Sequence, residues 1–206
     1  MRFGTLVVLI TVGMMCSFAM RADIIAIDFE GVPDSTSVTS LYAAQGVTFS
    51  SGILVVSGAF GGSLNELDFP PVIPGQGVFL NESDTTTLDF SQTVLSFYGH
   101  FTYGGPITLN FYGAGNTLLT TLTSAFQTNI GTNGDPGSSP NELFSAPNLA
   151  DAVRVDILAP STDFTLDNLT FATAEGTVTP IPEPGTGVVL SALGAFLYVA
   201  HRFRSR

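Results

Sequence analysis

The sequence predicts an all-β fold, a two-sheet antiparallel sandwich of jelly-roll type, flanked by an N-terminal signal helix and a C-terminal transmembrane helix. Two observations predict the sandwich. Short alternating or apolar runs, divided by Gly, Pro, Asn, Asp and Ser, fill residues 23–175, and no long helical pattern interrupts them. A third observation predicts the flanking helices, because each end of the chain carries an apolar stretch beside arginine.

Ten candidate strands make up the body of the chain. Turn sequences such as Gly104-Gly105-Pro106 separate them, as hairpin links do. Residues 129–141 are rich in Gly and Pro and predict a long surface loop, for which disorder is favoured over a functional role. The only helical turn that we expect lies near residues 39–44. The strands are expected at residues 24–29, 47–50, 53–57, 77–80, 86–90, 94–101, 107–112, 117–124, 152–158 and 164–172.

Residues 1–22 have the three-part layout of a secretory signal peptide. A basic start at Arg2 is followed by an apolar core and by small residues, and cleavage after Ala19 or Ala22 fits this layout. An uncleaved anchoring helix is the alternative, and a lipoprotein signal at Cys16 is disfavoured because bulky methionines precede it. We therefore expect export through the Sec machinery, with the β-sandwich domain, residues 23–175, outside the cytoplasm.

The charge of the chain excludes several classes of partner. It contains six Arg, no Lys and 17 acidic residues, a formal net charge of −11 at pH 7. Arg154 is the only cation between residues 23 and 180, where 16 acids bring the formal charge to −15. Nucleic-acid binding is therefore excluded, and anionic membranes are repelled. Because Cys16 is the only cysteine, the body forms no disulfide and no thiolate metal site.

The C-terminal segment combines three features in a fixed order. Fourteen apolar residues reach roughly 21 Å as a helix, which is short of a hydrocarbon core of about 30 Å. The arginines behind them are a topology signal, because by the positive-inside rule they stay cytoplasmic and leave the acidic body on the far side. The three features are Pro182, Glu183 and Pro184, then the apolar residues 187–200, then Arg202, Arg204 and Arg206.

This ordered combination resembles the PEP-CTERM sorting signal of exported proteins in Gram-negative bacteria. The resemblance covers residues 182–206, after a linker at residues 176–181, and Gly185 stands where Ser commonly follows the motif. It implies that a membrane-embedded exosortase recognises the Pro-Glu-Pro motif and removes the tail after a transient stay in the inner membrane. It also implies that the mature protein is associated with extracellular polymer or biofilm-type surfaces. A plain C-terminal anchor is the alternative, but it has no use for the motif.

The body resembles the β-sandwiches often found ahead of PEP-CTERM tails and, more loosely, the carbohydrate-binding jelly rolls. The resemblance rests on residues 27–31, Tyr42, residues 46–49 and residues 166–171. In the jelly rolls, an acid near the first strand and an Asp in the last share a structural calcium, which implies Glu30 and Asp167 as metal ligands here. Charge is consistent with this assignment, because paired carboxylates in a partly dry site repel unless a proton or a cation intervenes. The alternative is that both acids are solvated surface residues.

No catalytic constellation stands out in the sequence, which has no nucleophile elbow, phosphate loop or zinc signature. His100 is the only histidine of the exported body, and we expect it at a strand edge or at the surface. Tyr98, Tyr103 and Tyr112 form a sugar-binding patch only if they fall on one sheet face, and core filling is the alternative.

The main functional hypothesis is an exported, non-catalytic cell-surface or extracellular-matrix protein that is sorted and processed through its C-terminus. Its precursor is expected in the inner membrane with the domain in the periplasm, and the mature protein at the cell surface or outside the cell. The alternative is a carbohydrate-binding module for exopolysaccharide, with calcium as a structural cofactor. A glycoside hydrolase or lyase ranks third, because it requires two carboxylates that converge in a groove.

Overall fold

The structure is a computed structural model that describes residues 22–73, 77–160 and 162–174. The expected signal peptide, the linker and the sorting segment with Glu183 and the terminal arginines lie outside these residues. Among the described residues, no helix has the length and apolar character that a membrane crossing needs.

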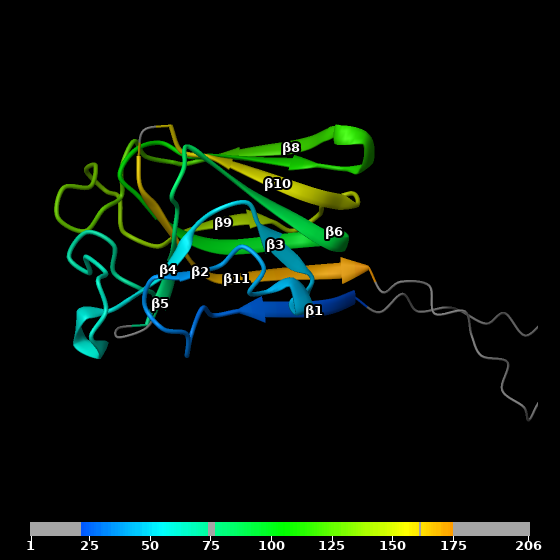
Figure 1. Cartoon of the computed structure of the whole chain (residues 1–206). Helices are drawn as coiled ribbons and strands as arrows, with labels where there is room; N and C mark the ends of the chain where they lie inside the picture. The colour runs from blue at the N-terminus through cyan, green and yellow to red at the C-terminus, as the bar shows by residue number, and fades with distance from the viewer. Residues whose placement is uncertain (1–21, 74–76, 161, 175–206) are drawn as a thin grey trace, which may run out of the picture. The chain divides into compact units, whose positions relative to one another are not determined.

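Eleven antiparallel strands and three short 3-10 helices make up the described chain (Figure 1), which confirms the all-β prediction. The strands are β1 Ala22–Ile27, β2 Thr36–Ser37, β3 Val47–Phe49, β4 Ile53–Val56, β5 Gly77–Leu80, β6 Thr85–Tyr103, β7 Thr108–Tyr112, β8 Leu118–Thr123, β9 Glu142–Ala146, β10 Ala152–Leu158 and β11 Phe164–Ala174. The helices are η1 Ala43–Gln45, η2 Gly58–Phe60 and η3 Ala114–Asn116.

The long strand β6 joins two layers of the fold. Its first part, up to Phe90, pairs with β3 on one side and with β10 on the other, and β7 and β8 continue this layer. Its second part, from Val94 onward, pairs with β11 and with β9. On the far side of β11 lie β1 and β5, and β4 and β2 extend the layer from β5. We call these the β10 layer and the β11 layer.

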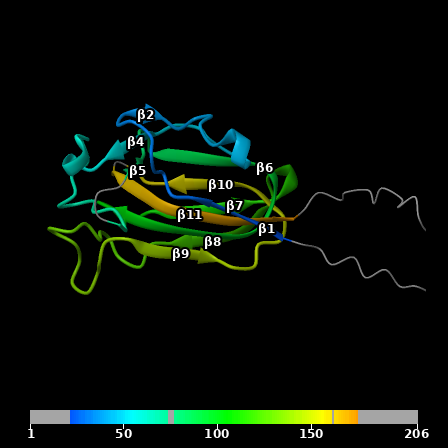
Figure 2. The same cartoon turned by 90° about the horizontal axis from the view of Figure 1, so that it is seen from below.

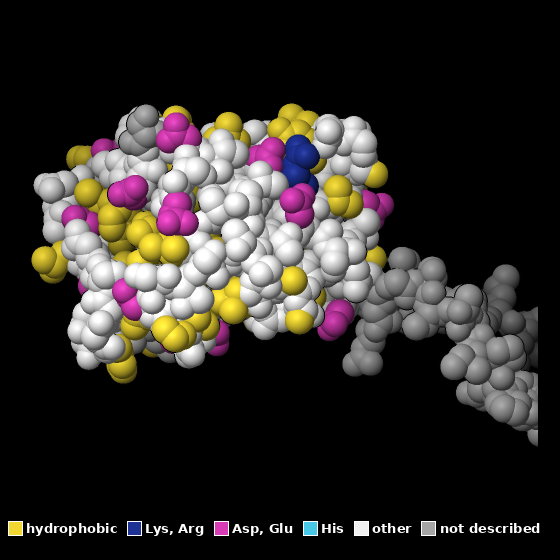
Figure 3. Space-filling model, viewed as in Figure 1, with side chains coloured by type: hydrophobic (Ala, Val, Ile, Leu, Met, Phe, Trp, Pro, Cys, Tyr) yellow, Lys and Arg dark blue, Asp and Glu magenta, His cyan; other side chains and the backbone are white. Residues whose placement is uncertain are grey.

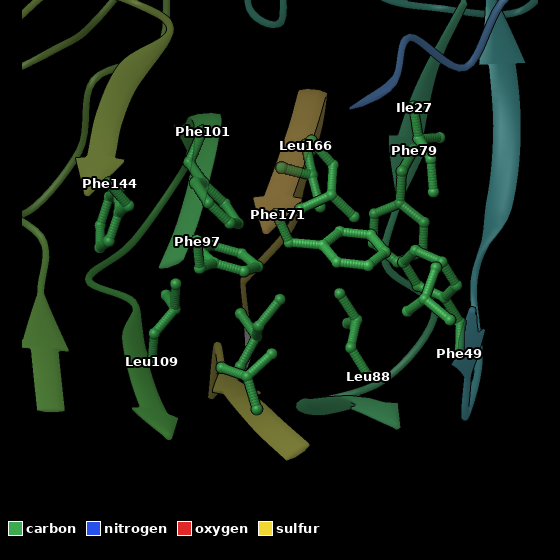
Figure 4. Close-up of a cluster of buried hydrophobic side chains, with 14 of the residues drawn as sticks. Ile27, Phe49, Phe79, Leu88, Phe97, Phe101, Leu109, Phe144, Leu166 and Phe171 are labelled. Carbon is green, nitrogen blue, oxygen red and sulfur yellow. The ribbon is translucent and has the colours of Figure 1, made fainter. Parts of the chain in front are cut away.

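A single hydrophobic core fills the space between the two layers. Phe97, Phe101 and Phe171 of the β11 layer and Leu88 and Leu109 of the β10 layer are completely buried. Figure 4 shows these side chains pointing into one cluster. Alternation along strands such as β7 and β10 directs every second residue into this core, whereas β5 and the first part of β11 are buried at consecutive positions.

The first and last strands of the body lie side by side (Figure 2). In the register of β1 and β11, Ala22 is opposite Ala174 and Ile27 is opposite Leu169. Ala22 and Ala174 are the first and last described residues, so the two ends of the described chain lie side by side. This pairing of first and last strands is the arrangement on which the calcium expectation depends.

Two strands of the structure were not expected from the sequence. The expected strands at residues 86–90 and 94–101 form the single strand β6, because the exposed residues Ser91 and Gln92 turn the strand without ending it. Strands β2 and β9 lie in segments where turn residues hide the short alternation. The expected helical turn is present as η1.

The expectation of disorder for residues 129–141 is wrong. Asn129 is completely buried, and its side chain accepts a hydrogen bond from the Tyr103 N–H at 2.7 Å. The same side chain donates to the carbonyl oxygens of Phe101 at 3.0 Å and Ser139 at 3.1 Å. The amide of Asn129 therefore replaces the backbone partner that a neighbouring strand would supply, and it fixes both ends of the loop to β6.

Replacing Asn129 by Ala should lower the free energy of unfolding by about 3 kcal/mol, because it leaves two buried backbone groups, the Tyr103 N–H and the Phe101 carbonyl, without this partner. Urea unfolding of the protein purified from producing cells measures the change. Asn133→Ala, an exposed amide in the same loop, is the control and should change stability little. Equal effects of the two variants would contradict the role of Asn129.

Candidate functional site

Three carboxylates gather where β1 ends and β11 bends. Asp28 and Glu30 follow β1, and Asp167 lies in β11 opposite His100 of β6. We call Asp28, Glu30 and Asp167 the acidic cluster. The structure thus brings the two predicted metal ligands into one region, as the pairing of first and last strands suggested.

Left-handed backbone conformations flank the acidic cluster on both strands. Phe29 has φ 61° and Asn168 has φ 49°, and neither is glycine. Phe29 is nevertheless 1% exposed and packs against Phe49 and Phe79 in the core, so its anchored ring holds the conformation. Asn168 begins the irregular stretch of β11 between Asp167 and Thr170. Both features reorient the neighbouring carboxylates relative to a regular strand.

Burial and neighbouring acids raise the pKa of two members of the acidic cluster, Glu30 and Asp167. Burial is the largest cause of the raised pKa of Glu30, followed by the charges of Asp28 and Asp167. Burial also raises the pKa of Asp167, although N–H groups of Val72 and Asn168 donate to it at 2.8 and 2.7 Å and oppose the rise. The charge of His100, opposite Asp167 in β6, also opposes the rise in pKa. The cluster therefore gathers acidic groups in a partly buried place, and among the described residues none of them is in an ion pair.

One oxygen of the acidic cluster fits a cation. Oε1 of Glu30 is buried and has no hydrogen-bond partner. Among the described residues, however, no group of three or more His, Cys, Asp or Glu side chains is arranged to hold a metal ion. Calcium, which takes six to eight oxygens, would have to draw further ligands from backbone carbonyls or water. The calcium site at Glu30 and Asp167 stays a prediction.

A second set of polar side chains lies on the outer surface of the β10 layer. Val155 and Ile157 of β10 point into the core, so Arg154 and Asp156 between them point outward. The pairing register of β6, β10 and β7 aligns two rows of side chains across these three strands. We call this set the Arg154 face. Its rows are Asp89, Arg154 and Tyr112, and then Thr87, Asp156 and Asn110.

Contacts within the Arg154 face hold the guanidinium in one orientation. The guanidinium carbon of Arg154 lies 4.4 Å from the centre of the Tyr112 ring. Its Nε lies 3.2 Å from Oδ1 of Asp156, and its Nη1 donates to Oδ1 of Asn116 at 2.8 Å. The Thr87 hydroxyl donates to the same oxygen of Asp156 at 2.9 Å. A planar cation stacked on a ring and fixed by two partners is preorganised to donate to a ligand.

The Arg154 face stays open to solvent. The side chains of Arg154 and Asp156 are 27% and 20% exposed, and Asp89 is exposed. Arg154 is the only Lys or Arg among the described residues, so it is the dark blue side chain of Figure 3, with magenta acids beside it. The amide nitrogen of Asn110 takes no part in the bonds within the face. Donors and acceptors of the face therefore remain available to a polar ligand.

The three tyrosines do not share a sheet face. Tyr103 is completely buried and its hydroxyl donates to Glu142, so it belongs to the core. Tyr98 lies on the outer side of the β11 layer, opposite Thr170, and Tyr112 lies on the outer side of the β10 layer. Only Tyr112 stands among other polar groups of a candidate site. Sequence analysis missed Arg154 and Asp156, although their alternation with Val and Ile in β10 and the rarity of basic residues were visible signals.

Comparison with known proteins gives no family. No family model matches the chain, and no curated protein matches it. Solved structures resemble it weakly. A family 29 carbohydrate-binding module complexed with mannohexaose has 13% identity over 75% of this chain and 94% of its own, with TM-score 0.37. An arabinose-bound α-L-arabinofuranosidase has 12% identity over 70% and 25%, with TM-score 0.39. Likeness at this level says nothing of what the present chain binds.

Calcium should raise the melting temperature of the purified protein, and Glu30→Gln should abolish that gain. Without a cation, the folded protein holds protons on Glu30 and Asp167 at pH values where the unfolded chain, with carboxyl pKa values near 4, has lost them. Their contribution to stability is therefore lost as pH rises through the raised pKa values. In chelator, Glu30→Gln should raise the melting temperature at pH 7 and not at pH 4.

Asp23→Asn is the matched control for the calcium experiment, since Asp23 is an exposed acid in β1, the strand that precedes Glu30. Calorimetry with calcium or with chelator supplies the melting temperatures. Identical melting temperatures of the unaltered protein with calcium and with chelator would contradict calcium binding at this site.

Proposed function

We propose that this chain is an exported, non-catalytic surface or matrix protein whose β-sandwich body binds exopolysaccharide through the Arg154 face. The observation that carries the proposal is the fixed, partly exposed row of Arg154 on Tyr112, with Asp156 and Asn110 beside it. Sugars present pairs of neighbouring hydroxyl groups, which require closely spaced donors and acceptors on a solvent-exposed surface. Charge-assisted bonds from a guanidinium and a carboxylate are the strongest of that kind.

The charge of the Arg154 face favours neutral polysaccharides as ligands. Asp89 and Asp156 outnumber the one cation, and the whole chain has a formal charge of −11. A polyanionic glycan would meet repulsion from the face and from the protein as a whole. The acidic cluster is a separate feature, and in this proposal it serves structure and not sugar recognition.

Export and processing follow from the two ends of the sequence. The proposal assigns residues 1–22 to export and residues 182–206 to recognition by an exosortase-type membrane enzyme. Two prolines around Glu183 fix φ and favour an extended segment that joins neither helix nor sheet, which suits a protease substrate. The mature protein then reaches the cell surface or the extracellular matrix.

Arg154→Lys should weaken binding to a neutral polysaccharide at least about tenfold, because lysine keeps the charge but loses the planar donors and the stacking on Tyr112. Affinity electrophoresis against dextran, β-glucan and mannan measures the change, with alginate as the anionic comparison. Tyr98→Phe, on the outer side of the other layer, should bind as the unaltered protein does. Undiminished binding of Arg154→Lys, or no binding by the unaltered protein to any of these glycans, would overturn the proposed site.

Glu183→Ala should leave the precursor uncleaved in its native host, because the processing enzyme loses the single charge of the motif. Mass spectrometry of the protein from producing cells shows whether the residues after the motif are still attached. Glu175→Ala, an acid outside the motif, should be processed normally. Normal processing of Glu183→Ala would refute the sorting assignment.

A further inference from the structure

Strand β8 is a free edge of the β10 layer. Within the part of the chain that the structure describes, it pairs with β7 alone and stands at the end of the strand order. An unpaired edge offers backbone N–H and C=O groups to another strand, and most proteins protect such edges with charge, proline or short length. The question for β8 is which groups it presents and what protects them.

The hydrogen bonds of β8 show which backbone groups face outward. The N–H of Ser124, just after the strand, donates to the carbonyl oxygen of Ile107 at 3.0 Å, so this residue points toward the β7 side. Alternation along an antiparallel strand then turns Leu122 toward β7, and Thr121 and Thr123 away from it. The outward row therefore consists of two threonines whose backbone groups have no partner strand.

β8 itself contains no charged residue, and two residues after the strand the Glu142 carboxylate accepts a hydrogen bond from the Ala125 N–H at 3.1 Å. The chain has no charged residue between His100 and Asp135, although it has 17 acids in all. Each of the other single-partner strands in the described chain is short or carries an acid: β2 has two residues and β3 has three, β1 contains Asp23, and β9 contains Glu142. With six residues and no charge, β8 is the longest unprotected edge among them.

We propose that two copies of this chain associate through antiparallel pairing of their β8 strands. A two-fold axis at Thr121 places Thr121 opposite its own copy and Thr120 opposite Leu122. Thr120 and Leu122 are opposite Phe111 and Leu109 of β7 in the register, so both face the core side, and the pairing continues the inner surface from one copy to the next. The outward backbone groups of Thr121 find partners in its copy, Thr123 comes opposite Leu119 of the copy beside the register shift of β8, and no charged residue of β8 is buried.

The association has a consequence for ligand binding that rests on the proposed function. A two-fold axis perpendicular to the sheet leaves the two Arg154 faces on the same side of one continuous sheet. Five strand spacings of about 4.8 Å separate one β10 from the other, which is about 24 Å. One polysaccharide chain can therefore reach both faces, and the dimer binds it with avidity that a single copy lacks.

Thr123→Pro tests the pairing, because proline removes an outward N–H that β7 does not use. The protein purified from producing cells should sediment as a dimer at micromolar to hundred-micromolar concentrations, and Thr123→Pro should raise the dissociation constant at least about tenfold. Thr123→Lys, which places charge at the edge, is a second variant with the same expected result. Thr123→Val keeps the N–H and should dimerise as the unaltered protein does.

Sedimentation without glycan separates this proposal from the proposed function. A monomer at 100 μM, or dimerisation of Thr123→Pro and Thr123→Lys equal to that of Thr123→Val, overturns the edge pairing. Binding of a short neutral oligosaccharide should be equal in all variants, while binding to long dextran or mannan should fall at least about tenfold in the proline variant. Loss of oligosaccharide binding with an intact dimer counts against the Arg154 face and leaves the pairing in place.

Discussion

The fold depends on one strand that serves both layers. Phe90 and Val94 of β6 are buried on either side of the exposed pair Ser91 and Gln92, so the strand turns between them without losing its core contacts. This bend fixes where β10 and β11 lie, because each pairs with a different part of β6. The Arg154 face on β10 and the acidic cluster beside β11 are therefore held on opposite layers by the same strand.

Acidic side chains in this protein stabilise loops through backbone N–H groups. Asp34 accepts from the N–H groups of Val56 and Ser63, and the first of these bonds is the main cause of its lowered pKa. Asp135 accepts from the Gln127 N–H at 2.7 Å. Because the described chain contains one arginine, ion pairs cannot stabilise these loops. Glu30 differs because one of its carboxylate oxygens, Oε1, is buried and has no hydrogen-bond partner.

Sequence pattern predicted most strands because alternation and turn residues are local signals, and β10 was placed at its observed bounds. The resemblance to carbohydrate-binding jelly rolls implied Glu30 and Asp167 as neighbours, and the pairing of β1 with β11 brings them into one region. Sequence pattern could not predict the Arg154 face, because Tyr112 and Asp89 join Arg154 only through the register of three strands. The ordered loop around Asn129 was missed for a similar reason: its stability comes from bonds to β6, far away in sequence.

The weak affinity expected for a single Arg154 face gives an energetic reason for the dimer that we propose at the β8 edge. A few hydrogen bonds on an open surface replace bonds to water and contribute about 1 kcal/mol each, so four or five such bonds give an affinity near the millimolar range. That is weak for retention in a matrix. Two coplanar faces on one polysaccharide convert the second contact into an intramolecular step, which typically strengthens binding by about 10²–10⁴. A shallow polar face therefore suits a protein that presents it in pairs, and an unprotected edge in the same layer is the means to do so.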